Sequence, residues 1–135
     1  MRPNGPEHLA AVAVGGVVGS LGRWGVGLAL PHAAGHWPWS TLVVNLTGCL
    51  LMGLLVARLA FGPRPHVLVR PFLAVGVLGG WTTFSAFSVD LLELANAGQQ
   101  LLAVAYVLVS LVVGVVAVGL GHVVGQWIWA SERSA

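Results

Sequence analysis

Two long stretches of the sequence contain no charged side chain, and this feature limits the fold more than any other. No Asp, Glu, Lys or Arg occurs among the 34 residues between Arg23 and Arg58, or among the 38 residues between Glu93 and Glu132. A helix needs about 20 apolar residues to cross a bilayer, so each stretch holds at least one span. No segment alternates apolar and polar residues as barrel strands do, so the spans are predicted to be helices.

The chain length sets the number of spans. Only 7% of the 135 residues are charged, far below the roughly one quarter that is usual in soluble domains. Four spans of about 20 to 25 residues with short connections use the whole chain. We predict an all-α membrane protein with a single transmembrane domain over residues 1–135 and no room for an organic cofactor-binding fold. The expected spans are approximately residues 9–30, 40–59, 72–95 and 101–129.

Several other classes of function lack support. The formal net charge is only +2 and there is no basic run, which argues against nucleic-acid binding. The one cysteine, Cys49, excludes a disulfide framework. His32 and His36 are four residues apart, but they fall in a proline-containing loop, so a metal site there is not expected. The spans hold no catalytic constellation of histidine, cysteine and carboxylate residues, so no enzyme is predicted.

Glycine is unusually frequent, with 19 residues, and much of it has helical spacing. Small residues on one face let helices approach closely in lipid, where the hydrophobic effect gives no help. We therefore predict tight helix packing, within or between subunits, along these stripes: Gly15, Gly19 and Gly22 in the first span, Gly48 and Gly53 in the second, and Gly114, Gly121 and Gly125 in the fourth.

The third span departs from a regular helical pattern. Gly79 and Gly80 lie near its middle and are followed by Trp81, Thr82 and Thr83. Glycine pairs and β-branched threonines weaken a helix, so a break is predicted here. A break at membrane depth frees carbonyl oxygens, which are ligands for hard cations. The alternative is that the glycines only allow close packing and the hydroxyls bond to the preceding turn.

Few polar side chains lie within the spans, and several share a helix face. Asn45 lies one turn from Thr41, and Ser110 one turn from Tyr106. Phe84 and Phe87 share a face of the third span, and their positive ring edges beside hydroxyl donors suit a small anion. Ordinary packing and helix–helix hydrogen bonds are the alternative explanation for all of these pairs.

Arg23 is a permanent charge about two-thirds of the way along the first span. Its long side chain could snorkel to the interface. Otherwise it would raise the positive potential of an aqueous vestibule.

Three ordered segments resemble the signatures of the small bacterial fluoride channels of the CrcB family. They read GGVVGSLGRW from Gly15 to Trp24, STLVVNLTGCLLMG from Ser40 to Gly53, and GGWTTFSAFS from Gly79 to Ser88. The likeness covers nearly the whole chain. It implies a fluoride-specific channel of the bacterial inner membrane that exports fluoride passively and so relieves its toxicity.

The resemblance also implies an assembly and a site. Family members are antiparallel, dual-topology dimers that enclose two fluoride pathways, with a structural sodium ion at the centre. The backbone carbonyls of Gly79 and Thr82 would hold the sodium ion, and Arg23 would lie in the vestibule. The fluoride pore would be lined by Asn45, Phe84, Phe87, Ser85, Ser88, Tyr106 and Ser110.

Some features depart from that pattern. Ala86 stands where a hydroxyl residue is common in the family, Leu50 where a phenylalanine is common, and Ser40 where a glycine is frequent. All arginines except Arg23 fall on the side of the two termini: Arg2, Arg58, Arg64, Arg70 and Arg133. The positive-inside rule then predicts one orientation, whereas a homodimer needs two. The partner is therefore either a second copy of the chain or an oppositely oriented paralogue.

A proton-coupled small multidrug exporter has the same size and is the competing hypothesis. Such an exporter needs a carboxylate within the membrane. Only Asp90 and Glu93 are candidates, and they are expected to reach water at the end of the third span. A non-transporting assembly subunit would explain the glycine stripes but not the polar residues.

Overall fold

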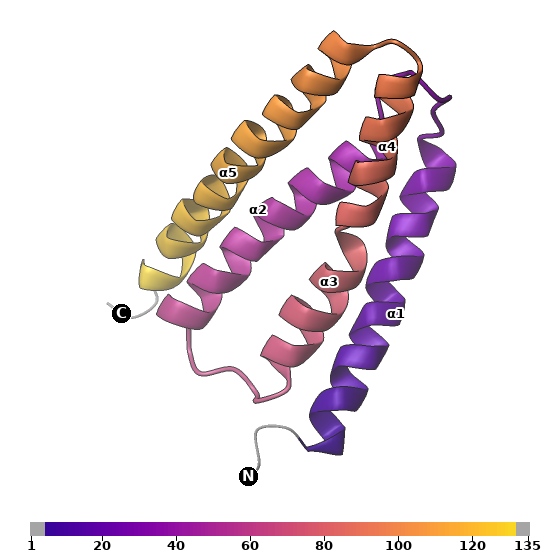
Figure 1. Cartoon of the computed structure of the whole chain (residues 1–135). Coiled ribbons are helices and arrows are strands. Elements are labelled where there is room, and N and C mark those ends of the chain that lie inside the picture. The colour runs from indigo at the N-terminus through magenta and orange to yellow at the C-terminus, as the bar shows by residue number, and fades with distance from the viewer. Residues whose placement is uncertain (1–4, 132–135) are drawn as a thin grey trace.

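Four membrane-length segments run up and down in the computed structural model, which describes residues 5–131 (Figure 1). The first, second and fourth are single helices, and the third is divided. The elements are α1 (Pro6–Ala29), α2 (Trp39–Phe61), the π-helix η1 (Pro71–Val77), α3 (Leu78–Trp81), α4 (Phe84–Asn96) and α5 (Gln100–Ser131). All described regular structure is helical, as the sequence predicts.

The helix ends follow local sequence signals. Pro6 opens α1 and Pro71 opens η1, positions where the missing amide proton of proline has no helical partner to lose. The proline-containing segment between Phe61 and Pro71 forms the connection between the second and third spans. Gly98 has a φ of 75° in the turn between α4 and α5, a conformation that glycine adopts without steric cost.

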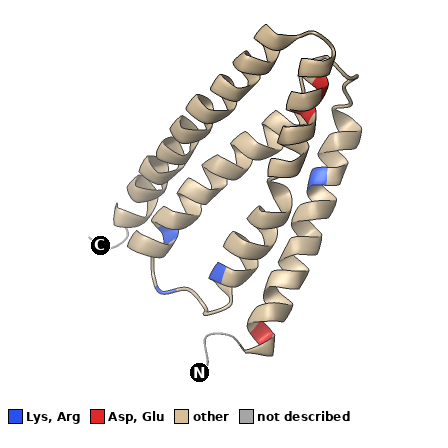
Figure 2. Ribbon diagram, viewed as in Figure 1, with Lys and Arg blue, Asp and Glu red and all other residues tan. Residues whose placement is uncertain are grey.

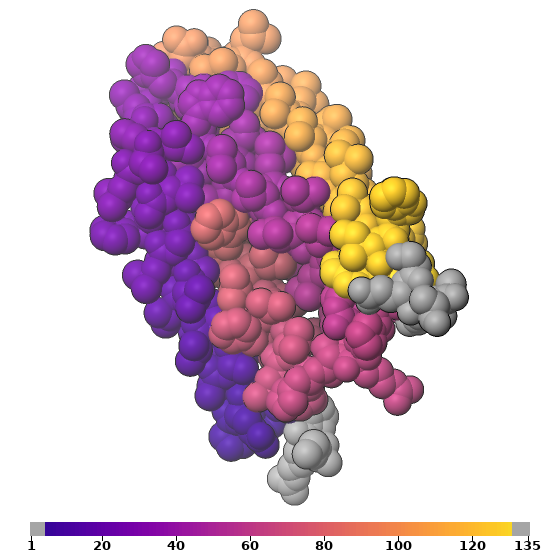
Figure 3. Space-filling model, turned by 180° about the vertical axis from the view of Figure 1, so that it is seen from behind, coloured from indigo at the N-terminus to yellow at the C-terminus, as the bar shows by residue number. Residues whose placement is uncertain are grey.

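The spans pack as two helix pairs through their small residues. Helix α2 packs along α5, and α1 packs along η1 and α3. A Cβ atom on Gly53 would collide with the backbone of Val118, and one on Gly19 would collide with the backbone of Val77. These contacts confirm close packing along the stripes. The two pairs touch each other less, and the third span is visible between α1 and α2 from behind (Figure 3).

The break in the third span falls later than the glycine pair. Gly79 and Gly80 lie within α3, whereas Thr82 and Thr83 have extended backbone, with ψ angles of 159° and 128°. Gly80 is needed where α1 approaches, because a Cβ there would lie 2.5 Å from the Gly16 carbonyl oxygen. The predicted break is thus confirmed, and within the predicted run it falls at the two threonines.

Most of the surface along the four membrane-length spans is apolar. A small core of Leu42, Leu94, Ala103 and Tyr106 joins α2, α4 and α5. Large apolar side chains are exposed along α1 and α5, and Phe84 is 80% exposed at the start of α4. Such surfaces are compatible with lipid or with another apolar protein face.

Candidate functional site

Asn45 holds the broken segment in place from the neighbouring helix α2. Its Nδ2 donates to the Thr83 carbonyl oxygen at 2.9 Å, and its Oδ1 accepts from the Thr83 amide at 2.8 Å. Thr83 then caps α4, because its Oγ1 accepts a hydrogen bond from the Ala86 amide at 3.1 Å. The side chain of Asn45 therefore pairs the Thr83 amide, which loses its helical acceptor at the break, and adds a donor to the Thr83 carbonyl, which also accepts the first hydrogen bond of α4.

These hydrogen bonds leave carbonyl oxygens free on one side of the break. The Thr83 amide, which would pair with Gly79 in a continuous helix, is taken by Asn45. The Ala86 amide, which would pair with Thr82, is taken by the Thr83 hydroxyl. The carbonyls of Gly79 and Thr82 thus lose their helical donors, and Gly79 itself is exposed. Free carbonyl oxygens at the end of a short helix are suitable ligands for a small cation.

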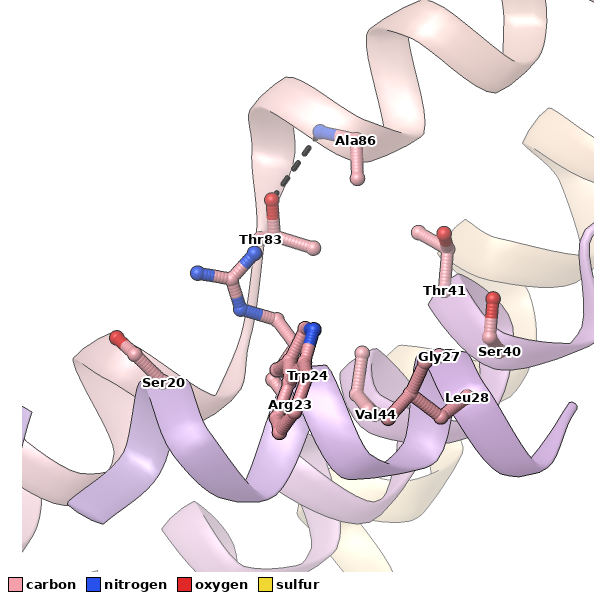
Figure 4. Close-up of a pocket in the computed structure, with 10 residues that line it drawn as sticks. All are labelled: Ser20, Arg23, Trp24, Gly27, Leu28, Ser40, Thr41, Val44, Thr83 and Ala86. Atoms are coloured by element: carbon pink, nitrogen blue, oxygen red, sulfur yellow. Dashed lines mark hydrogen bonds between the residues drawn. The ribbon is translucent and has the colours of Figure 1, made fainter. Parts of the chain in front are cut away.

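Arg23 points inward rather than to the interface. Its Nε donates to the Gly80 carbonyl oxygen at 3.0 Å, and its side chain is half-buried. The guanidinium group lies toward Thr83 across a groove (Figure 4). The Arg23 side chain thus bonds within the protein instead of extending to the interface as snorkelling requires. We name the hollow, of about 430 Å³, the arginine groove; it is lined by Ser20, Arg23, Trp24, Gly27, Leu28, Ser40, Thr41, Val44, Thr83 and Ala86.

A second groove of about 610 Å³ lies on the other side of the break, and we name it the phenylalanine groove. The rings of Phe84 and Phe87 line it, with centroids 5.9 Å apart and planes at 31°. The Ser110 hydroxyl oxygen is buried and has no hydrogen-bond partner among the described residues. The other lining residues are Asn45, Gly48, Cys49, Met52, Ala74, Leu78, Gly79, Thr82, Thr83, Leu111 and Val118.

The remaining expected pore residues lie outside this lining. Ser88 and Ser85 are exposed on α4; Ser88 donates to the Phe84 carbonyl, and the Ser85 hydroxyl lies 3.2 Å from that of Thr83. Tyr106 is fully buried, behind the Phe87 ring at a centroid distance of 5.0 Å. Tyr106 therefore supports the wall of the phenylalanine groove and is not part of its surface.

Two features of the site were not predicted. Asp90 was expected to reach water, but it is only 8% exposed, and it accepts a hydrogen bond from Tyr106 at 3.2 Å and contacts His32. Trp81 donates through Nε1 to the Thr47 hydroxyl at 2.9 Å and so joins α3 to α2. Both pairs link residues that are far apart in the sequence, and no local pattern indicates them.

The fold defines a multi-pass helical membrane protein, with two grooves beside a broken helix. The sequence comparisons identify which one. Residues 10–122 match the family model described as "CrcB-like protein, Camphor Resistance (CrcB)". The chain belongs to this family.

Curated relatives cover most of the chain. It is 44% identical over 120 residues to the "Fluoride-specific ion channel FluC" of Agrobacterium fabrum, covering 88% of this chain and 96% of the relative. It is 46% identical over 110 residues to "FluC 2" of Thermobifida fusca, covering 79% and 82%. It is 42% identical over 118 residues to "FluC 3" of Streptomyces avermitilis, covering 87% and 58%. The family is one of ion channels, not of enzymes.

Proposed function

We propose that the chain is a fluoride-specific ion channel that lets fluoride leave the cytoplasm passively. One observation carries the proposal: a cationic groove and a groove of ring edges and hydroxyls meet at Thr83, on the two sides of the break. The names of the family's curated relatives support the same activity. The competing exporter hypothesis has no such support.

Fluoride is small and strongly hydrated, so a pore must replace its lost water by close donors. The Ser110 hydroxyl, unpartnered and buried, is one such donor in the phenylalanine groove. The edges of Phe84 and Phe87 carry partial positive charge and supply further contacts without a proton to exchange. Asn45 has one amide proton left after its bond to Thr83. We infer that this set binds the dehydrated anion.

Arg23 supplies the positive potential at the entrance. Its charge lies in a cavity partly shielded from water, where a charge attracts anions more strongly than at an open surface. The bond from Nε to Gly80 leaves both terminal nitrogens of the guanidinium free to face the groove. We infer that Arg23 concentrates fluoride beside the break.

We propose that a structural sodium ion binds at the free carbonyls of Gly79 and Thr82. The geometry fits this role because both oxygens have lost their helical donors and Gly79 is exposed. When bound, sodium supplies positive charge that holds the broken segment in place. Two carbonyls are too few for a complete sodium shell, so a second chain is needed to supply the rest.

We infer that the channel is an antiparallel dimer. The exposed Phe84 and Gly79 give the phenylalanine groove an open wall that a partner subunit would close. Arg58, Arg64 and Arg70 lie at the end where the described chain begins and finishes (Figure 2); Arg2 and Arg133 are outside the described residues. This bias favours one orientation, and numbered relatives such as FluC 3 are consistent with a paralogous partner. A second copy in dual topology is the alternative.

Fluoride efflux from liposomes tests the proposal. Purified protein is reconstituted with fluoride inside, and release is read with a fluoride electrode beside a chloride control and a Phe84→Ile variant. We expect rapid release of fluoride but not chloride, and loss of release in the variant. If no fluoride is released by the chain alone, and none after an oppositely oriented paralogue is added, the assignment as a fluoride channel is overturned. Topology reporters fused to the C-terminus test the partner. If they are detected on both sides of the membrane in cells that lack a paralogue, the chain does not need an oppositely oriented paralogue.

A further inference from the structure

His32, Asp90 and Glu93 form a cluster outside both grooves. His32 lies in the loop between α1 and α2, while Asp90 and Glu93 are three residues apart on α4 and share a face. Each offers one ligand atom, and these atoms lie within 4.8 Å of one another. The shortest pair is His32 Nε2 and Asp90 Oδ1, at 3.4 Å. The cluster thus brings one imidazole nitrogen and two carboxylate oxygens together from separate parts of the chain.

A hydrogen bond from the buried Tyr106 orients the Asp90 carboxylate. The Tyr106 hydroxyl donates to Oδ2 at 3.2 Å, and Tyr106 is itself fully buried between Trp37 and Phe87. This bond leaves Oδ1 directed to His32. A buried hydrogen bond that fixes a carboxylate in this way is the usual support of a metal ligand.

Among the described residues, His32 is the only basic side chain at the cluster. Arg58, Arg64 and Arg70 lie at the opposite end of the bundle (Figure 2), and Arg23 bonds to Gly80. Within residues 5–131, the structure gives the Glu93 carboxylate no hydrogen bond or ion pair. His32 carries at most one positive charge beside two carboxylates, whereas a divalent cation would offset the desolvation of both.

We propose that His32, Asp90 and Glu93 bind a divalent transition-metal ion such as Zn²⁺. Imidazole favours such an ion over Ca²⁺ and Mg²⁺, which prefer all-oxygen shells. Three protein ligands with a water molecule in the fourth position are a common zinc arrangement. Bonds of about 2.0 to 2.2 Å in a tetrahedral site place the ligand atoms about 3.4 Å apart; His32 and Asp90 already have this spacing, and the Glu93 ligand atom lies within 4.8 Å of theirs. The site is separate from the proposed fluoride and sodium positions.

Calorimetric titration of the purified full-length protein in detergent with zinc chloride tests the site. We expect one zinc ion per chain and about tenfold or greater loss of affinity in His32→Asn, since one of three ligands is removed. Glu93→Gln should weaken binding similarly. His36→Asn is the matched control, because His36 belongs to the same loop, is exposed and lies outside the cluster; its affinity should be unchanged.

The outcomes separate cleanly. No zinc-dependent heat from the unmodified protein, unchanged affinity in His32→Asn, or equal loss in His36→Asn would overturn the proposal and leave the His32–Asp90 pair as a hydrogen-bonded link between loop and helix. Circular dichroism checks that each variant is folded. If His32→Asn does not fold, the zinc affinity of Glu93→Gln tests the site instead. The titration contains no fluoride, so a failure of the channel assignment would not affect it.

Discussion

The two grooves beside the broken helix share Thr83 and differ in nearly everything else. The arginine groove holds a permanent cation and the hydroxyls of Ser20, Ser40 and Thr41. The phenylalanine groove holds two rings, the unpartnered Ser110 hydroxyl and no charged side chain. One groove is suited to attract an anion from water, and the other to hold it once its water is lost.

This division has a physical reason. A fixed cation acts over several ångströms and needs no close fit, so it serves at an entrance. A cation deep in a narrow path would hold the anion too firmly for conduction. Neutral donors and ring edges act only at contact distance, so they can select by size while allowing release.

The largest effect is expected at Asn45, which holds the segment that both grooves share. Asn45→Leu removes two hydrogen bonds and leaves the Thr83 amide unpaired, at a cost of about 1–3 kcal/mol for that group. We expect fluoride efflux to be abolished and the thermal unfolding temperature to fall. Efflux from liposomes and a thermal melt in detergent measure the two effects.

Thr47→Val is the matched control for Asn45. It lies on the same helix and loses the hydrogen bond from Trp81 and those to the Val43 and Val44 carbonyls, but none to Thr82 or Thr83. A loss of about 1 kcal/mol in stability with efflux retained is expected. If Asn45→Leu conducted as well as Thr47→Val, the two grooves would not depend on a common support.

The position of this support could not be predicted from local sequence. Hydropathy located the four spans, and the glycines with the threonines indicated a break in the third. The break itself is set by Asn45, which lies 38 residues away from Thr83. The π-helix Pro71–Val77 was likewise not foreseen. Such long-range hydrogen bonds depend on how α2 lies beside the third span, which periodicity does not encode.

The next largest effect tests the phenylalanine groove alone. Ser110→Ala removes a donor that has no partner in the described residues, so the fold loses little. A hydrogen bond to a charged group contributes about 1.5–3 kcal/mol, so efflux should fall by roughly tenfold or more. Ser110→Thr keeps the hydroxyl and should retain most of the efflux. Equal loss in both variants would indicate a packing role instead.

A smaller effect, and one that depends on salt, is expected in the arginine groove. Arg23→Gln removes the charge but keeps an amide donor for the Gly80 carbonyl. We expect efflux to fall by about threefold to tenfold at low ionic strength and less at 0.15 M, where screening acts within about 8 Å. Arg23→Lys keeps the charge and is the control. A loss independent of salt would contradict the entrance role.

The lining of these two grooves also shows which site residues could be assigned from the sequence. Arg23, Asn45 and Phe84 stand in signatures that resemble a known family, and each lines a groove. Tyr106 lies one helical turn from Ser110 and was expected to line the pore with it, yet Tyr106 is fully buried and hydrogen-bonded to Asp90. Whether a helical residue faces a cavity or the core depends on the rotation of its helix, and α5 is apolar on every side, so its sequence does not indicate the inward face.

The smallest effect concerns Ala86, which lines the arginine groove opposite Arg23 (Figure 4). Ala86→Ser adds a second hydroxyl to the wall of the groove that already carries Thr83. A donor beside Arg23 should help to exchange water for fluoride, so efflux should rise by no more than about twofold, because both sides of the exchange involve hydrogen bonds of similar strength. Initial efflux rates at matched protein density measure this change. Ala86→Val is the control, because it enlarges the side chain at the same position without adding a hydroxyl. A large increase would mean that entry, rather than passage beside Phe84 and Phe87, limits conduction, and the division of roles between the two grooves would then need to be reversed.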